Sequence, residues 1–380
     1  MKVLHLLNEL KPSGAEIMLR IAAPFFRANG VECEILSTGP QPGPYAALLE
    51  AAGYRIHHIP FSKNPVFFFK VAQLVRRTGA ELVHLHTERA FMAYVLALKA
   101  FTRCQLVRTV HNNFQFEGFL RQRRSWERQL AERWGLRYIA IAPGVMENEQ
   151  QRFGTHPELI PNWFDSARFS VPTEQERATA RQALQLPPGV PVLVSIGNCS
   201  PVKNHTALIE ALAQCQDLPW HYLHLGMEEP GEPERAMAAR LGLADRISFY
   251  GAVNDVRPYL HAADLYTMPS RFEGMSIAAL EAQATGLRAL LADVPGLKDF
   301  RHYLGEVSYC APDAGPIASS LRALLGQAQH ADPAGAQARS AAIHAAFGAE
   351  RGVKAYSDLY RKLLGRPGAS QRSAQQGQPT

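Results

Sequence analysis

The chain has 380 residues, of which 47% are hydrophobic and 19% are charged, and its formal net charge at pH 7 is +6. This composition is typical of a globular protein and excludes a mainly disordered chain. The length predicts two domains, and no apolar run is long enough to span a bilayer. The five cysteines show no Cys-x-x-Cys spacing, so we expect reduced, buried thiols in a cytoplasmic protein.

The first half of the chain alternates short apolar strands with helical segments. The expected strands are residues 3–7, 33–37, 55–59, 82–85, 106–110 and 138–141, followed by a last short strand and turn at 158–162. Between them, residues 16–28, 66–77 and 89–100 carry apolar residues at helical spacing. This alternation predicts an α/β, doubly wound parallel sheet. Ligands of such sheets bind at the carboxyl ends of the strands.

The second half repeats the alternation. Residues 163–190 are rich in proline, alanine and charge, and we interpret them as a crossover between domains. A second alternating block begins at Val192 and continues to about residue 325, and residues 349–364 form an amphipathic helix. Residues 366–380 are rich in Gly, Ser, Gln and Pro and are expected to be disordered. We predict two Rossmann-like domains, residues 1–165 and 166–348, which face each other across a cleft.

The excess positive charge lies in the first half. Residues 1–164 hold 20 Lys and Arg against 13 Asp and Glu, whereas the remaining residues hold 20 against 21. Much of the excess lies between residues 121 and 137, where six arginines are interleaved with Trp126 and Trp134. This segment either lies on an anionic membrane surface or is a solvated surface helix. We expect no nucleic-acid binding, since no recognised binding module occurs.

Two carboxylates in the second half, Glu273 and Glu281, have seven residues between them. A helix that begins near Gly274 would offer its first free N–H groups as an anion site beside Glu273. Glu281 would then lie about 12 Å further along and on nearly the same side. This layout suits a nucleotide sugar, with sugar hydroxyls, diphosphate and ribose hydroxyls bound in turn. The alternative is an amphipathic helix that happens to carry two glutamates.

Neighbouring segments strengthen the first interpretation. A buried strand at 192–197 leads into a loop with Lys203, and further landmarks follow at 223–226, 247–251 and 263–270. With Glu273 and Glu281, this series resembles the retaining GT-B glycosyltransferases of family 4, especially those that build bacterial exopolysaccharide, capsule or O-antigen. The resemblance covers roughly residues 1–365 and is more specific in the second half. It implies a GT-B fold with an N-terminal acceptor domain and a C-terminal donor domain. It also implies that the helix 349–364 packs back on the first domain.

The resemblance assigns roles to residues of the second domain. Lys203, at a helix start, would add its charge to the backbone donors that hold a diphosphate. Glu273 would bind the hydroxyls of the donor sugar, and Glu281 those of the ribose. Further donor contacts would come from the amides of Gly274, Met275 and Ser276 and from the backbone near Val253. The family usually has arginine where this chain has Asn198, so Asn198 would donate only a neutral hydrogen bond and Arg271 is a candidate substitute.

Candidates in the first domain are fewer. Gly14, between the first strand and the first helix, either lets the backbone approach a ligand or simply belongs to a helix-capping loop. In the family, a histidine at the strand end matched by His111 reaches the donor sugar, and an imidazole there can hydrogen-bond a hydroxyl or developing charge. His86 and Arg124 are weaker candidates for the acceptor side, and His5 is expected in the core. No cluster shows metal-ligand spacing, so neither a metal nor a cofactor is predicted.

We therefore predict a retaining hexosyltransferase that moves a sugar from a UDP- or GDP-sugar to a glycan or lipid-linked glycan in cell-surface polysaccharide biosynthesis. The resemblance implies front-side attack, in which the leaving phosphate takes the acceptor proton. We expect the protein to lie in the cytoplasm, with the basic first half of the chain toward the inner face of the membrane. A GT-B sugar-nucleotide epimerase and a catalytically weak nucleotide-sugar-binding partner in a biosynthetic complex remain alternatives. The spacing near Gly14 is not Gly-x-Gly-x-x-Gly, which argues against an NAD enzyme.

Overall fold

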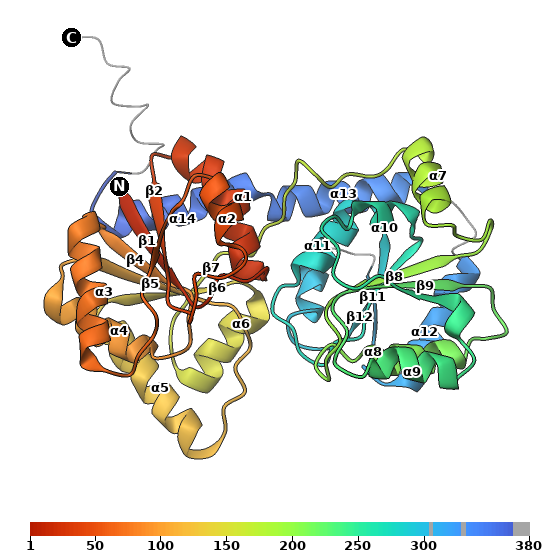
Figure 1. Ribbon diagram of the computed structural model, residues 1–380, viewed down its shortest axis with the longest axis horizontal. Coiled ribbons are helices and arrows are strands. Elements are labelled where there is room, and N and C mark those ends of the chain that lie inside the picture. Colours follow the sequence, from red (N-terminus) through yellow and green to blue (C-terminus); the bar gives the residue numbers. More distant parts are fainter. Residues whose placement is uncertain (304–306, 328–331, 368–380) are drawn as a thin grey trace, which may run out of the picture. The chain divides into compact units, whose positions relative to one another are not determined.

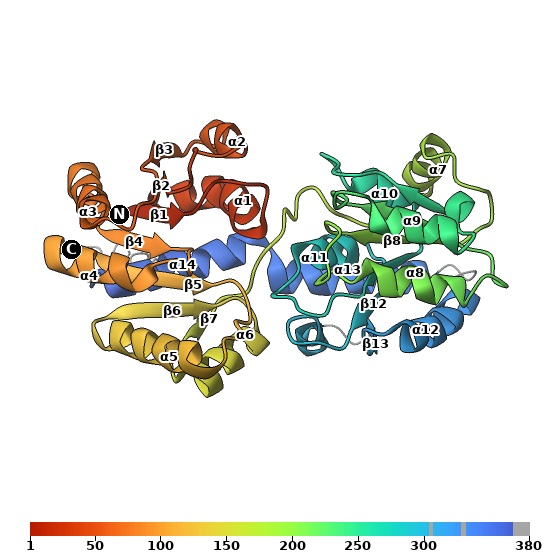
Figure 2. The same cartoon turned by 60° about the horizontal axis from the view of Figure 1, so that its bottom comes forward.

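A computed structural model of the protein describes residues 1–303, 307–327 and 332–367. The chain divides into two compact units. The first unit comprises Met1–Trp163 and the helix that begins at Ala349, and the second unit comprises Phe164–Gly348. Both are parallel α/β units, as the alternating pattern predicts (Figures 1 and 2). Residues 368–380 of the tail predicted to be disordered lie outside the described residues.

The first unit is built on one parallel sheet. Its strands are β1 (Lys2–Leu7), β2 (Glu32–Ser37), β3 (Arg55–His58), β4 (Leu82–Leu85), β5 (Gln105–Val110), β6 (Leu136–Ala140) and β7 (Glu158–Leu159). They are ordered β3-β2-β1-β4-β5-β6-β7 across the sheet. The order reverses between β1 and β4, so the carboxyl ends of β1, β4 and β5 lie side by side at one edge.

Helices cover this sheet in two groups. They are α1 (Gly14–Ala28), α2 (Ala46–Ala51), α3 (Pro65–Thr78), α4 (Phe91–Phe101), α5 (Gly118–Arg133), α6 (Pro143–Asn148), the π-helix η1 (Glu149–Phe153) and α14 (Ala349–Leu363). α14 packs against α1, whereas α3, α4 and α5 contact one another in sequence (Figure 1). Tyr356 and Tyr360 of α14 are buried in this core.

The second unit has a six-stranded parallel sheet. Its strands are β8 (Val192–Ile196), β9 (His221–Leu225), β10 (Ile247–Phe249), β11 (Leu265–Met268), β12 (Arg288–Ala292) and β13 (Val307–Cys310). They are ordered β10-β9-β8-β11-β12-β13 across the sheet. The loops that follow β8 and β11 are therefore neighbours, although about 70 residues separate them in the chain.

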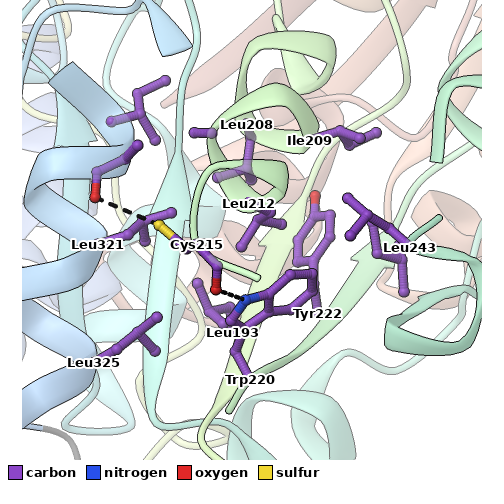
Figure 3. Packing of buried hydrophobic residues seen from close by; sticks show 14 of the residues in the cluster. Leu193, Leu208, Ile209, Leu212, Cys215, Trp220, Tyr222, Leu243, Leu321 and Leu325 are labelled. Atoms are coloured by element: carbon purple, nitrogen blue, oxygen red, sulfur yellow. Dashed lines mark hydrogen bonds between the residues drawn. The ribbon is translucent and has the colours of Figure 1, made fainter. Parts of the chain in front are cut away.

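Seven α-helices and two 3-10 turns of the described chain surround this sheet. They are α7 (Glu174–Ala183), α8 (His205–Ala213), α9 (Pro233–Arg240), η2 (Ala244–Arg246), α10 (Arg257–Ala262), α11 (Ile277–Ala284), η3 (Lys298–His302), α12 (Ala314–Gln327) and α13 (Pro333–Phe347). Between α8, α12 and the sheet lies an apolar core that includes Leu212, Trp220 and Leu321 (Figure 3). The buried indole of Trp220 donates to the carbonyl of Cys215 at 2.8 Å, so its N–H is not left unpaired.

The structure differs from the sequence expectations at two helices. The segment interpreted as a plain crossover contains α7, which a capping box of Thr173 and Glu176 initiates. The helix expected to begin near Gly274 begins at Ile277, because Ser276 is its N-cap and its Oγ accepts from the amide of Ala279.

All five cysteines are free, with Cys33 and Cys310 half-buried and the others buried. Among the described helices, none combines the length and the apolar character needed to cross a bilayer.

Candidate active site

Two adjacent loops of the second unit bring the predicted donor-binding residues together. One loop links β8 to α8 and holds Lys203; the other links β11 to α11 and holds Glu273. The amide of Arg271 donates to the carbonyl of Val202 at 2.8 Å, which joins the two loops through their backbones. The buried side chain of Asn204 reinforces this junction by donating to the carbonyl of Pro269 at 3.0 Å.

Lys203 and Glu273 form an ion pair, in which Nζ lies 2.5 Å from Oε1. The side chains are 27% and 13% exposed, so a ligand can reach both groups. The pair places a cation and a hydrogen-bond acceptor at one point of the surface. That is the combination that a phosphate next to a sugar hydroxyl requires. An incoming anion must share or replace the contact that Lys203 makes with Glu273.

The backbone after Glu273 precedes α11 rather than forming its first turn. Gly274, Met275 and Ser276 are buried, and Met275 is 3% exposed. The segment is held close to Gly296, which has φ +88°; a Cβ there would lie 2.2 Å from the carbonyl oxygen of Glu273. Only glycine permits this approach. Glu281, half-buried, lies just over one turn into α11 instead of the two turns expected.

Asn198 ties its loop to the one that follows β9. Its Oδ1 accepts from the amide of Met227 at 2.9 Å, which leaves the Nδ2 donors for a ligand. Gly226 lies so near this loop, with φ +147°, that a Cβ would come within 2.1 Å of the carbonyl oxygen of Gly197. Arg271 is exposed beside this site, and Val253 is half-buried in the loop after β10.

In the first unit, His111 follows the carboxyl end of β5 and is half-buried. Burial, with the neighbouring Arg108 guanidinium, lowers its pKa to about 4, so the imidazole is neutral at pH 7. Its Nε2 lies 3.0 Å from Nδ1 of His86. Gly14 is the exposed first residue of α1.

A cluster of histidines surrounds His86, and sequence reasoning assigned it no role. Nδ1 of His5 lies 3.0 Å from Nε2 of His86, and the ring of His84 is tilted by 30° relative to that of His86, with ring centroids 4.1 Å apart. His5 and His84 face each other in the register of β1 and β4, so only the strand order reveals the cluster. A small cavity borders these rings and is also lined by Met18, Phe26 and Trp163, among others. Ring nitrogens of His5, His84 and His86 lie within 4.8 Å of one another.

The basic segment divides into buried and exposed arginines. Arg128 is fully buried and pairs with Glu88 and Glu149, so it cannot face a membrane. Arg124, a candidate for the acceptor side, pairs with Glu127 at 2.9 Å. Exposed positions on and beside α5 include large apolar side chains and arginines: Phe119, Leu120, Trp126, Trp134, Arg121, Arg133 and Arg137.

Two family models match the chain. The model described as Glycosyltransferase Family 4 matches residues 12–168, and the model described as Glycosyl transferases group 1 matches residues 190–327.

Several curated relatives of the chain are named as glycosyltransferases. The Bacillus subtilis protein named "Putative glycosyltransferase EpsF" is 25% identical over 77% of this chain and 79% of its own length. The lipopolysaccharide glucosyltransferase WaaG of Escherichia coli is 29% identical over 42% of this chain and 43% of its own. A D-inositol 3-phosphate glycosyltransferase of Nocardia farcinica is 32% identical over 37% and 33%. The chain thus spans less than half of the latter two relatives.

Solved structures agree on the fold. A glycosyltransferase from Rickettsia africae superposes with a TM-score of 0.82 at 16% identity, over 96% of this chain and 99% of that one. Anabaena HepE, solved in complex with UDP-glucose, superposes with a TM-score of 0.79 at 22% identity, over 96% and 99%. The chain therefore has the GT-B fold, with an N-terminal region that matches the Glycosyltransferase Family 4 model and a C-terminal region that matches the Glycosyl transferases group 1 model.

Proposed function

We propose that the protein transfers a sugar from a nucleoside diphosphate sugar to a glycan or lipid-linked glycan, with retention of anomeric configuration. The observation that carries this proposal is the contact between Lys203 and Glu273, which unites a cation and a sugar-hydroxyl acceptor on two neighbouring loops. HepE has been solved in complex with UDP and with UDP-glucose, which supports a nucleotide sugar as the donor.

In this proposal the second unit binds the donor. Lys203 and the Nδ2 donors of Asn198 hold the diphosphate, and Arg271 supplies the second cation. Glu273 accepts from the sugar hydroxyls, and Glu281 accepts from the ribose. The amides of Gly274, Met275 and Ser276 and the backbone near Val253 complete the donor site, while Gly14 offers an amide from the first unit.

The chemistry needs no protein nucleophile. In front-side attack, the acceptor hydroxyl bonds to the anomeric carbon as the bond to the diphosphate oxygen breaks, and that phosphate takes the proton. His111 is the proposed catalytic histidine, since it is neutral at pH 7 and can hydrogen-bond a hydroxyl or developing charge. Arg124 is assigned to the acceptor side, whereas His86, the other candidate for that side, uses both ring nitrogens on His5 and His111. No step in this scheme requires a metal.

We assign the exposed part of α5 to an anionic membrane surface, where a lipid-linked acceptor is presented. Trp126 is 64% exposed and Phe119 is 79% exposed, and exposed arginines accompany them. Apolar side chains that enter the interface and cations that meet anionic headgroups both favour such binding. The name of WaaG, a lipopolysaccharide glucosyltransferase, supports a role in cell-surface polysaccharide synthesis, which we assign to the cytoplasmic face of the membrane.

The first experiment is a thermal-shift screen with UDP and GDP, followed by turnover of the corresponding labelled sugar nucleotides. A ligand that binds the folded state at 100 times its Kd stabilises it by about 2.7 kcal/mol. We expect one nucleotide to raise the melting temperature and His111→Ala to lose transfer but keep this shift. Binding without turnover across acceptors would favour the nucleotide-sugar-binding partner. No shift with either nucleotide would contradict the proposal.

A further inference from the structure

A line of three hydrogen-bonded imidazoles leads from the core of the first unit to His111. Nδ1 of His5 lies 3.0 Å from Nε2 of His86, and Nδ1 of His86 lies 3.0 Å from Nε2 of His111. The three residues belong to neighbouring strands, because His5 lies in β1, His86 follows β4 and His111 follows β5. The backbone fixes this alignment, since the amide of His86 donates to the carbonyl of Leu6 at 2.9 Å.

All three rings are neutral at pH 7. Burial lowers the pKa of His5 to about 3 and that of His111 to about 4, and burial together with the neighbouring histidines puts the pKa of His86 well below its usual value. A neutral imidazole has one N–H donor and one bare acceptor nitrogen. Each ring must therefore donate on one side and accept on the other, so the whole line is polarised in one of two directions.

The buried end of the line selects the direction. Nε2 of His5 is buried and has no hydrogen-bond partner among the described residues. A proton on this nitrogen would create an orphaned N–H, which is rarer in proteins than an unsatisfied acceptor. The proton of His5 therefore belongs on Nδ1, which donates to Nε2 of His86. His86 then donates through Nδ1 to Nε2 of His111, so the proton of His111 belongs on Nδ1.

We propose that His5 and His86 are positioning residues that hold His111 in its Nδ1–H tautomer, so that His111 meets its ligand as a neutral hydrogen-bond donor. This inference rests on the proposed function only for the identity of the ligand, a hydroxyl or phosphate oxygen of the sugar nucleotide. The tautomer itself follows from contacts within the first unit. His86 thus acts through His111.

The same cluster also has the spacing of a metal site, but its hydrogen bonds favour the imidazole line. His84 uses both nitrogens, since Nδ1 lies 2.6 Å from the Tyr360 hydroxyl and Nε2 lies 2.7 Å from Oγ1 of Thr109. A metal ion bound by all three histidines would have to break one of these bonds and one of the two hydrogen bonds of His86. His84 instead packs against His86, with the two ring centroids 4.1 Å apart.

The test compares two replacements of His86 in the full chain labelled with 15N-histidine. Two-bond 1H–15N correlation spectra distinguish Nδ1–H from Nε2–H, and the His111→Gln spectrum assigns the His111 signals. His86→Asn places an amide donor near the position of Nδ1, whereas His86→Phe keeps the ring volume and removes the donor. Tyr360→Phe is the matched control, because it removes a hydroxyl from the same cluster but not from the line.

We expect the Nδ1–H tautomer of His111 in the native protein, in His86→Asn and in Tyr360→Phe, and its replacement by Nε2–H in His86→Phe. The kcat of His86→Phe should fall about threefold to tenfold, the effect of one hydrogen bond, with the KM for the donor nearly unchanged. Native His111 protonated at Nε2 would overturn the inference, as would a His86→Phe spectrum identical to the native one. Zn²⁺ that shifts the His5, His84 and His86 signals together at stoichiometric concentration would also overturn it, in favour of a metal site. A correct tautomer without any turnover would refute only the proposed function.

Discussion

Replacing Lys203 by methionine removes the charge from the proposed diphosphate site and keeps most of the apolar stem. A hydrogen bond to a charged group contributes roughly 1.5–3 kcal/mol, which corresponds to about 10- to 150-fold in Kd. Because the Lys203 side chain is 27% exposed, solvent weakens the interaction. We therefore expect the Kd for the preferred nucleoside diphosphate to rise by about tenfold in Lys203→Met.

Replacing Glu273 by glutamine should have the opposite effect on the same ligand. In the ligand-free protein Nζ of Lys203 lies 2.5 Å from Oε1 of Glu273, so a diphosphate competes with this carboxylate. Such partly exposed pairs contribute about 0–1 kcal/mol, so Glu273→Gln should tighten UDP or GDP by up to about fivefold. Turnover of the complete sugar nucleotide should nevertheless fall, because the glutamine is a weaker acceptor for the sugar hydroxyls.

Isothermal titration calorimetry with the free nucleotide and with its sugar conjugate measures both effects. Lys354→Met is the control, since Lys354 is an exposed lysine of α14 that pairs only with Asp358 among the described groups. An unchanged nucleotide Kd in Lys203→Met would refute the assigned role of Lys203. A Glu273→Gln protein that binds free nucleotide as weakly as Lys203→Met would refute the competition between the carboxylate and the diphosphate.

Three further predictions concern stability, loop packing and membrane binding. Burial lowers the pKa of His5 to about 3 and of His111 to about 4, so between about pH 6.5 and pH 4 the unfolded chain binds protons that the folded chain does not. The free energy of unfolding should therefore fall with decreasing pH in this window, by up to about 1.4 kcal/mol per pH unit for each histidine. Urea titrations at pH 7.5, 6 and 5 measure this dependence. If the free energy of unfolding of a His5→Phe variant depended on pH as steeply as that of the native protein, the prediction would be wrong. Gly296→Ala should abolish the nucleotide-dependent thermal shift by pushing away the loop before α11, whereas Gly189→Ala, with a similar φ of +71° but no atom within 4 Å of the added Cβ, should keep it. Trp126→Ser should lower partitioning onto anionic vesicles about tenfold in co-sedimentation, because it removes a large apolar side chain whose burial contributes roughly 1.5–3 kcal/mol. Equal partitioning of the two proteins would show that Trp126 does not contact the membrane.

The elements of the two sheets could be predicted from sequence because each strand is a short apolar run and each helix has its own periodicity. β4 was predicted with its exact bounds, and β1, β2, β3, β5 and β6 differ by one or two residues at their ends, whereas the segment 158–162, predicted as a strand and turn, contains the two-residue strand β7. The helix α7 was not predicted, because the prolines on either side of it indicated an irregular connection. The capping box of Thr173 and Glu176 is a sequence signal that could have revealed it. The predicted start of α11 near Gly274 was wrong, because the side chain of Ser276 caps the helix by accepting from a free amide of its first turn.

The contacts within the candidate site depend on strand order, which single-sequence patterns do not give. The pairing of Lys203 with Glu273 requires β8 and β11 to be neighbours. The imidazole line requires β1 to lie beside β4, so that His5 comes level with His84. Sequence could nominate His86 and His111 as strand-end residues, but it assigned His5 only to the core.

The helix α14 closes a core whose other parts are more than 180 residues earlier in the chain. Tyr360 meets His84 at 2.6 Å, and Tyr356 meets Thr109 at 2.9 Å. During synthesis at about 5–20 residues per second, the ribosome needs roughly 10–40 s to proceed from Trp163 to the end of α14. Throughout that interval the nascent first unit lacks its last covering helix and exposes apolar surface, while the second unit is still emerging. Maturation of the histidine-bearing unit is thereby tied to the synthesis of α14, and a chain that stops before α14 would be a substrate for chaperones and proteases rather than a working half-enzyme.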